Sequence, residues 1–214
     1  MSRTPTTILL AAALLAPHSL ALAVPTALNL IPTADVPGPR NFCWQLEADG
    51  HTTPFSAGAQ YWLLTCFGIT DELEVGLDRM ESRDDGAWFL DAKLLLTPET
   101  DRTPALALGA RDLTRGGPAN FWYLVATKDL GSVRTTFGYQ NDETGRLLIG
   151  ATHQLSDTTS LLADWTSGPD AYAALGLAHQ VGPNLTALLY FARGSSSPDD
   201  SFVGLNICRS CCWR

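Results

Sequence analysis

The stretch SVRTTFGYQ, residues 132–140, alternates between two kinds of side chain. Val133 and Phe137 fall on one face of an extended chain, whereas Arg134 and Gln140 fall on the other. Side chains along a strand point to opposite faces in turn, so this alternation predicts a β-strand with one apolar and one polar face. The stretch therefore favours an all-β fold whose sheet meets different surroundings on its two faces.

The same pattern extends over most of the chain. Beyond the N-terminal region, apolar residues do not recur at the spacing of an amphipathic helix for any useful length. Twelve strands are predicted, three of them with fairly apolar residues on both faces, at residues 41–49, 58–68, 72–79, 87–96, 103–112, 120–130, 132–140, 146–154, 158–166, 171–180, 184–193 and 201–207.

The predicted connections form two sets that alternate along the chain. One set is mostly tight, as at Gly131, 155–157 and 181–183, and the other is rich in Gly, Pro, Ser and Asp, as at 50–57 and 194–200. This alternation is typical of an up-and-down antiparallel transmembrane barrel, with short turns at one rim and longer loops at the other. Hydrocarbon offers no partner to an open sheet edge, so the first strand is expected to pair with the last.

Aromatic residues gather where the predicted strands meet the longer loops. Amphipathic rings suit the headgroup layer of a membrane, so this distribution predicts an interfacial girdle. Its expected members are Tyr61, Trp62, Trp88, Phe121, Trp122, Tyr123, Tyr139, Trp165, Tyr172, Tyr190, Phe191 and Phe202.

The N-terminus has the features of a secretory signal peptide. Arg3 precedes an apolar run at residues 8–16, and Ala21-Leu22-Ala23 supplies small residues for cleavage after Ala23. We expect residues 1–23 to be a signal peptide, 24–40 an extended N-terminal segment, 41–207 the barrel and 208–214 an atypical Cys-rich tail. An exported barrel with such strands is expected in the outer membrane of a Gram-negative envelope, in contact with its lipid.

The charge balance argues against nucleic acid as a partner. The chain has 22 acidic and 14 basic residues, and loss of Arg3 with the signal peptide takes its formal charge from −8 to −9. Nucleic-acid binding favours a basic surface instead. No later stretch is long and apolar enough for a transmembrane helix.

Charged residues alternate with the apolar face and are expected inside the barrel. They could pair across a small lumen and fill it, or they could line a narrow water-filled path, and the pattern fits both. These residues are Glu47, Glu74, Asp78, Asp91, Lys93, Arg111, Arg134 and Asp164.

Five cysteines are present. Cys43 and Cys66 are placed roughly symmetrically about the first predicted loop, so a cross-strand disulfide is possible in an oxidising periplasm. Cys208, Cys211 and Cys212 crowd the end of the chain. Their CxxCC spacing without a second ligand pair is weak evidence for metal, and we interpret the tail as an altered terminus.

Catalytic chemistry has few candidates in this sequence. His153 with Ser156 could be proposed as a base and nucleophile of a barrel hydrolase, but it lies at a tight turn without an evident orienting group. Glu47, Glu74 and Asp164 could act as acid and base, although a charged lumen explains them better. The histidines, His51 and His179 included, give no metal spacing, so we expect no enzyme, no cofactor and no metal site.

One family resemblance is carried by several stretches within residues 29–128. NLIPTADV (29–36) resembles the opening segment of YjbH-type exopolysaccharide-associated outer-membrane proteins and related uncharacterised barrels. Similar matches occur at EVGLD (74–78), DAKLLL (91–96), PALALGARDL (104–113) and YLVATK (123–128). The resemblance implies an outer-membrane barrel linked to polysaccharide export or its machinery, and it transfers no functional residue. The break in alternation after Ile207 departs from the usual last strand of such barrels and puts barrel closure in doubt.

The sequence thus predicts a porin-like barrel that serves as a channel or as an envelope scaffold. A soluble periplasmic β-sandwich or lipocalin-like binding module is the first alternative, and a barrel hydrolase is the second. Substrate and oligomeric state have no sequence signal.

Overall fold

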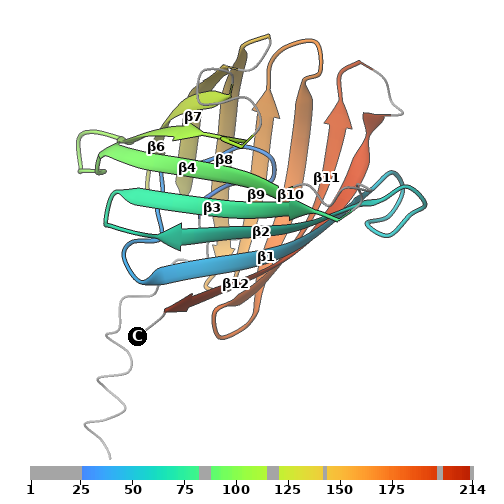
Figure 1. Cartoon of the computed structure of the whole chain (residues 1–214), viewed down its shortest axis with the longest axis horizontal. Coiled ribbons are helices and arrows are strands. Elements are labelled where there is room, and N and C mark those ends of the chain that lie inside the picture. Colours follow the sequence, from blue (N-terminus) through green and yellow to red (C-terminus); the bar gives the residue numbers. More distant parts are fainter. Residues whose placement is uncertain (1–25, 82–87, 115–120, 142–143, 197–199, 213–214) are drawn as a thin grey trace, which may run out of the picture.

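A computed structural model describes residues 26–81, 88–114, 121–141, 144–196 and 200–212 of the 214-residue chain. The predicted signal peptide, residues 1–23, lies outside the described residues. The described chain forms one closed antiparallel barrel, which Figure 1 shows from the side. Its strands are β1 (Asn41–Gly50), β2 (Gln60–Gly68), β3 (Leu73–Met80), β4 (Trp88–Thr97), β5 (Ala105–Ala110), β6 (Trp122–Asp129), β7 (Val133–Asn141), β8 (Arg146–Ser156), β9 (Thr159–Thr166), β10 (Tyr172–Gly182), β11 (Leu185–Gly194) and β12 (Phe202–Cys212). The prediction of twelve strands in an up-and-down barrel is confirmed.

The barrel closes where β1 pairs with β12. Their register runs without a break from Asn41↔Cys212 to Gly50↔Val203. The predicted end of the last strand at Ile207 is therefore wrong, because β12 continues through Cys208 to Cys212. Backbone hydrogen bonds do not depend on side-chain polarity, so the strand persists after its apolar alternation has ended.

The short connections lie at one rim and the longer loops at the other. Gly131, with a φ of 94°, turns the chain between β6 and β7 in a left-handed conformation that glycine adopts without steric cost. Asn184 does the same between β10 and β11, with a φ of 58°. We call the rim that carries these turns the turn rim and the opposite one the loop rim.

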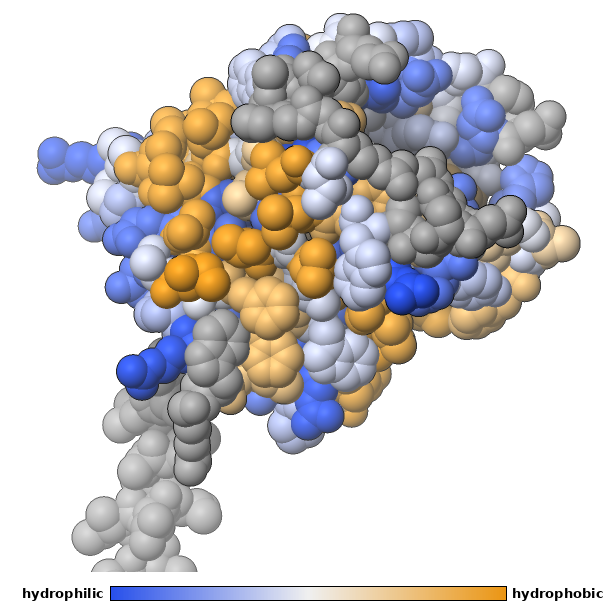
Figure 2. Space-filling view, in the orientation of Figure 1, coloured by the Kyte–Doolittle hydropathy of each residue, from blue (hydrophilic) through white to orange (hydrophobic). Residues whose placement is uncertain are grey.

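The outward face of the barrel is apolar and exposed. Figure 2 shows a broad patch of apolar side chains on the face turned toward the viewer. The exposed outward residues come from strands around the barrel and include Leu46, Leu77, Leu94, Leu108, Leu124, Phe137, Ile149, Leu177 and Leu189. Among the described residues there is no helix long and apolar enough to cross a membrane.

The predicted aromatic girdle is partly wrong. Trp88, Tyr139 and Trp165 are exposed on the outward face, in line with the prediction. Tyr123 and Tyr190 are instead buried inside the barrel. Inside the wall small residues make room for them, since a Cβ atom on Gly109 would lie 2.1 Å from the Tyr123 ring. The prediction rested on nearness to the longer loops and included adjacent residues such as Tyr190 and Phe191, which point to opposite faces of a strand.

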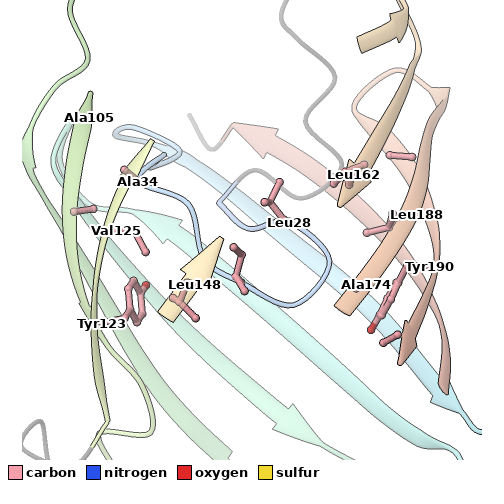
Figure 3. Close-up of a cluster of buried hydrophobic side chains, with 14 residues drawn as sticks. Leu28, Ala34, Ala105, Tyr123, Val125, Leu148, Leu162, Ala174, Leu188 and Tyr190 are labelled. Atoms are coloured by element: carbon pink, nitrogen blue, oxygen red, sulfur yellow. The ribbon is translucent and has the colours of Figure 1, made fainter. Parts of the chain in front are cut away.

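The segment that precedes β1 lies inside the barrel. Residues 24–40, predicted as an extended lead-in, are described from Thr26, and the chain turns back on itself through Leu28 N–H donating to the Ile31 carbonyl at 2.8 Å. We call residues 26–37 the strap. Figure 3 shows Leu28 and Ala34 of the strap among wall residues such as Leu148 and Leu188. Ile31 is fully buried in this cluster, with 0 % exposure.

A disulfide joins Cys43 of β1 to Cys66 of β2. The two residues face each other in the strand register, and their Cα atoms are 5.2 Å apart. The cross-strand bridge that the sequence allowed is therefore present. It ties the strand that follows the strap to its neighbour near the turn rim.

Candidate functional site

All eight charged residues expected inside the barrel face its interior, and they divide into two groups. Four of them contact the strap, namely Glu74, Lys93, Arg134 and Asp164. The other four line a cavity nearer the loop rim, namely Glu47, Asp78, Asp91 and Arg111. The candidate site therefore has two parts, the strap with its anchors and the cavity beyond it.

The first anchor lies at the turn rim and consists of ion pairs. Arg134 of β7 contacts Asp35 of the strap at 2.5 Å and Glu99 of the β4–β5 connection at 2.8 Å. Lys128 of β6 lies 3.3 Å from Glu99. Arg134 thus bridges the strap to the wall through two carboxylates, a geometry for which a planar guanidinium is well suited.

Glu99 is held in its charged form by this anchor. Partial burial raises the pKa of Glu99, but the hydrogen bond from the Asp129 backbone N–H, at 2.7 Å, and the pair with Arg134 outweigh that effect. The net result is a pKa below the usual value of the carboxyl group. Protonation of Glu99 would remove one of the two partners of Arg134.

Further anchors use side chains of the wall to bind the strap backbone. Asp164 of β9 accepts hydrogen bonds from the backbone N–H groups of Asn29 at 2.7 Å and Leu30 at 3.2 Å. Thr127 of β6 accepts one from Ala34 at 2.8 Å. Hydrogen bonds of this kind satisfy backbone groups that no strand pairs with.

The third set of anchors lies around Thr26. Its hydroxyl donates to Glu74 at 3.2 Å, and its carbonyl accepts from the Lys93 ammonium group at 3.2 Å. Lys93 and Glu74 also form an ion pair at 3.2 Å. Lys93 is only 2 % exposed, so a carboxylate partner is needed to offset the cost of burying its charge.

Glycines in the wall shape the space that the strap occupies. A Cβ atom on Gly150 of β8 would lie 2.2 Å from Leu28, and one on Gly176 of β10 would lie 2.0 Å from the Asn29 side-chain oxygen. A Cβ atom on Gly68 would lie 1.7 Å from the carbonyl oxygen of Gly38, where the strap joins β1. The wall is therefore matched to the strap by the absence of side chains at these positions.

The cavity, which we call the outer chamber, lies between the strap and the loop rim. Its main part has a volume of about 420 Å³ and is lined by Leu30 of the strap, by aromatic residues and by charged residues. A smaller part of about 110 Å³ runs beside the strap at Thr26, Ala27 and Pro32, past Gln45, and reaches the disulfide toward the turn rim. Both parts are lined by Leu64, Asp78, Asp91 and Arg111, so we treat them as one chamber.

Hydrogen bonds position the acidic residues of this half of the barrel. The backbone N–H of Thr65 donates to Asp78 at 2.9 Å, and that of Asp112 donates to Asp91 at 2.8 Å. The Tyr190 hydroxyl lies within hydrogen-bond distance of both Glu47, at 2.9 Å, and Asp49, at 2.8 Å. Its one proton can serve only one of these carboxylates at a time.

The structure does not join the catalytic candidates into a dyad. His153 contacts the backbone carbonyl of Ser132 at 2.7 Å, and the Ser156 hydroxyl accepts a hydrogen bond from the Thr158 backbone N–H. His179 is paired with Thr159, and His51 lies at the loop rim against the Ser201 carbonyl. Among the described residues, no group of three His, Cys, Asp or Glu side chains is arranged to hold a metal ion.

Sequence reasoning found the charged wall but missed the strap. The strap has no periodicity, and its contacts bridge residues as distant in sequence as Asn29 and Asp164. A usable signal lay in the wall, where Gly150 of β8 and Gly176 of β10 interrupt the inward faces of the two strands that flank β9 with its buried Asp164. Small inward residues beside a charge indicate that something other than a wall side chain fills that space.

Comparison with known proteins supports the fold. No protein-family model matches the chain, and no curated protein matches its sequence. Among solved structures, the chain is similar to the KdgM porin, with a TM-score of 0.55, 7 % identity, and coverage of 81 % of this chain and 99 % of that one. A structure of the KdgM porin in complex with disordered oligogalacturonate gives a TM-score of 0.52 at 8 % identity, with coverage of 81 % and 99 %. The chain thus has the closed antiparallel barrel fold of an outer-membrane porin.

Proposed function

We propose that the protein is an integral outer-membrane channel held closed by its own N-terminal strap. The observation that carries this proposal is the position of residues 26–37, which lie across the interior of a closed barrel and are bound to its wall by polar contacts. A scaffold would need only a filled core, whereas polar anchors can be exchanged for water when a segment leaves.

The distribution of side chains supports a place in a lipid bilayer. Exposed leucine and phenylalanine side chains cover the outward face, whereas charged groups are turned inward. In water this arrangement would expose a large apolar surface, but hydrocarbon is a suitable solvent for it. The soluble sandwich is disfavoured because one sheet closes on itself and no second sheet covers its apolar face among the described residues.

The strap supports a closed state of the channel. Ile31 and Leu28 pack against Val125, Leu148 and Leu162 at the centre of the barrel. Solute passage therefore requires the strap to move, and the cost of that movement depends on its anchors. If the strap exchanges between a bound and a released position, the current is proportional to the population of the released state.

A saccharide is the solute class that the comparisons favour. One similar porin structure is a complex with oligogalacturonate, and the YjbH-type resemblance of residues 29–36 links the chain to exopolysaccharide export. An envelope scaffold for export machinery is the second candidate, supported by that resemblance and by the filled lumen. Conductance distinguishes the two.

The test is a planar-bilayer recording of the purified full chain and of a strap-release variant. That variant combines Arg134→Ala and Asp164→Ala, which removes one ion-pair anchor and one backbone anchor. Each charged hydrogen bond contributes about 1.5–3 kcal/mol, so we expect the open fraction to rise at least about tenfold. Arg79→Ala is the matched control, because Arg79 pairs with Glu81 near the loop rim and contacts no strap residue in the described contacts.

Two outcomes would contradict the channel. One is a strap-release variant that keeps the heat-dependent gel shift of a folded barrel but carries no current. The other is a folded variant lacking residues 26–37 that carries none. Either result would favour the envelope scaffold as the function of the protein. Equal current from the wild type and the variant would instead show that the strap does not close the lumen.

A further inference from the structure

Acidic side chains outnumber basic ones in the lining of the outer chamber. Its main part is lined by Glu47, Asp78, Asp91 and Asp112 with Arg111 as the basic residue, and its smaller part adds the paired Glu74 and Lys93. A carboxylate removed from bulk water is costly unless a cation or hydrogen bonds offset it. Asp78 and Asp91 each accept one backbone N–H, and their carboxyl groups also lie within hydrogen-bond distance of each other. The chamber therefore has a capacity for a further positive charge.

A second observation shows a polar atom prepared for a ligand. The Gln45 side chain is only 4 % exposed and lines the smaller part of the chamber. Its amide nitrogen donates to Glu47 at 2.9 Å, but its oxygen has no hydrogen-bond partner among the described residues. A buried carbonyl oxygen without a partner costs free energy, and a hydrogen-bond donor in the chamber would remove that cost.

The wall beside these acids is aromatic. The rings of Trp62 and Phe89 have centroids 5.6 Å apart, and Phe121 lines the same space. Aromatic faces attract ammonium groups and also stack against the apolar faces of sugar rings and other compact molecules. The volume of about 420 Å³ lies within the range of about 300–1,000 Å³ that is usual for small-molecule sites.

From these observations we infer that the outer chamber binds a solute that carries a protonated amine on a body the size of one sugar ring. The ammonium group would lie among Asp78, Asp91 and the Gln45 oxygen, and the body would rest against Trp62 and Phe89. Arg111 and Lys93 line the smaller part of the chamber and would repel the amine, so they limit how deeply the charge can enter. The inference adds a substrate class to the proposed channel and rests on the chamber being open at the loop rim.

Direct binding tests this inference without any current. The full chain in detergent micelles is titrated calorimetrically with glucosamine, with glucose as its neutral counterpart and with galacturonate as its anionic one. We expect glucosamine to bind at least about tenfold more tightly than the other two, because one charged hydrogen bond distinguishes it from glucose. Asp78→Asn and Asp91→Asn keep the shape of the side chain and one acceptor oxygen. Each should weaken the binding of glucosamine about tenfold and leave the binding of glucose unchanged.

Two further variants separate the chamber from general charge effects. Glu81→Gln removes a carboxylate near the same rim that lines neither part of the chamber, and it should leave glucosamine binding unchanged. Arg111→Gln should strengthen glucosamine binding. Equal affinity for all three sugars, preference for galacturonate, or no binding by a folded barrel would overturn the inference. Because calorimetry needs no open pore, such a failure is distinct from a failure of the channel proposal, which only the bilayer recording can show.

Discussion

At the scale of single residues, Arg134 has the most consequential position. It joins the strap to the wall through Asp35 and to the turn rim through Glu99. A guanidinium stays charged throughout the accessible pH range, so any pH response of this anchor comes from its carboxylate partners. Glu99 belongs to a connection outside the strands, and its pKa is lowered by this contact and by the Asp129 N–H.

Acidification is expected to weaken this anchor. A depressed pKa in the folded state contributes stability that is present above the ordinary value of 4.5 and is lost as pH falls through the folded value below it. Glu99→Gln should therefore lower the free energy of unfolding of the barrel at pH 7 by about 1–2 kcal/mol, and its thermal midpoint should fall accordingly. The difference from the wild type should persist to pH 5 and shrink toward pH 3. Melting curves followed by circular dichroism would show this, with Glu81→Gln as the control.

A pH-independent difference between the wild type and Glu99→Gln would contradict this assignment. It would mean that the substitution acts through packing of the connection between β4 and β5. No difference at pH 7 would mean that Lys128 and Arg134 contribute nothing through this carboxylate.

At the scale of the elements, the last strand determines whether the sheet closes. Residues 208–212 pair with the first half of β1, from Gln45↔Cys208 to Asn41↔Cys212. They also contact β11 through Leu185↔Arg209 and Thr186↔Cys208. Without them the first residues of β1 would present an edge, and an edge in hydrocarbon has no partners.

Truncation after Ile207 is expected to destabilise the barrel strongly. Each backbone group left unpaired in hydrocarbon costs several kcal/mol, so we expect loss of the heat-dependent gel shift or a fall of at least about 3 kcal/mol in unfolding free energy. A chain that lacks only residues 213–214 is the control and should behave as the wild type. Identical denaturation midpoints for the two chains would show that the pairing of residues 208–212 adds nothing.

The strands themselves were predictable, whereas the contents of the barrel were not. Alternation in 132–140 predicted β7 because a strand between two different surroundings must alternate, and the inward place of Arg134 followed from the same rule. Tyr190 was assigned to the membrane interface because it lies near a longer loop, but its side chain points into the barrel. The strap depends on contacts between residues distant in the sequence, such as Asp35 with Arg134, and local pattern carries no information about those. The outer chamber was likewise seen only as a set of inward charges, without its cavity.

At the scale of the whole molecule, lipid is proposed to take the role that a second protein layer has in a sandwich. Leu177 of β10 is 47 % exposed on the outward face, and Leu130 in a turn is 65 % exposed. Both leucines are exposed, but only Leu177 lies in the middle of a strand. Without a bilayer both side chains would contact water, whereas in a bilayer Leu177 would contact hydrocarbon and Leu130 would lie near the membrane surface.

Leu177→Arg is expected to destabilise the barrel in lipid vesicles by about 2–4 kcal/mol, the cost of arginine near the middle of a bilayer. Leu130→Arg should cost less than about 1 kcal/mol, because the turn lies near the membrane surface. Urea titration of both variants in phosphatidylcholine vesicles, followed by tryptophan fluorescence, measures the difference. Two equally mild variants would favour a soluble protein over a membrane barrel.

The way the strap is attached gives the two ends of the barrel separate roles. Residues 38–40 join the strap to β1 at the turn rim, and the Arg40 N–H holds this connection by donating to the Gly68 carbonyl at 3.2 Å. A tethered segment of this kind can swing out only toward the side on which it is hinged. Under the proposed channel function, a partner that releases the strap would act from the turn rim, and the solute would enter at the opposite rim. Opening would then depend on one compartment and solute entry on the other.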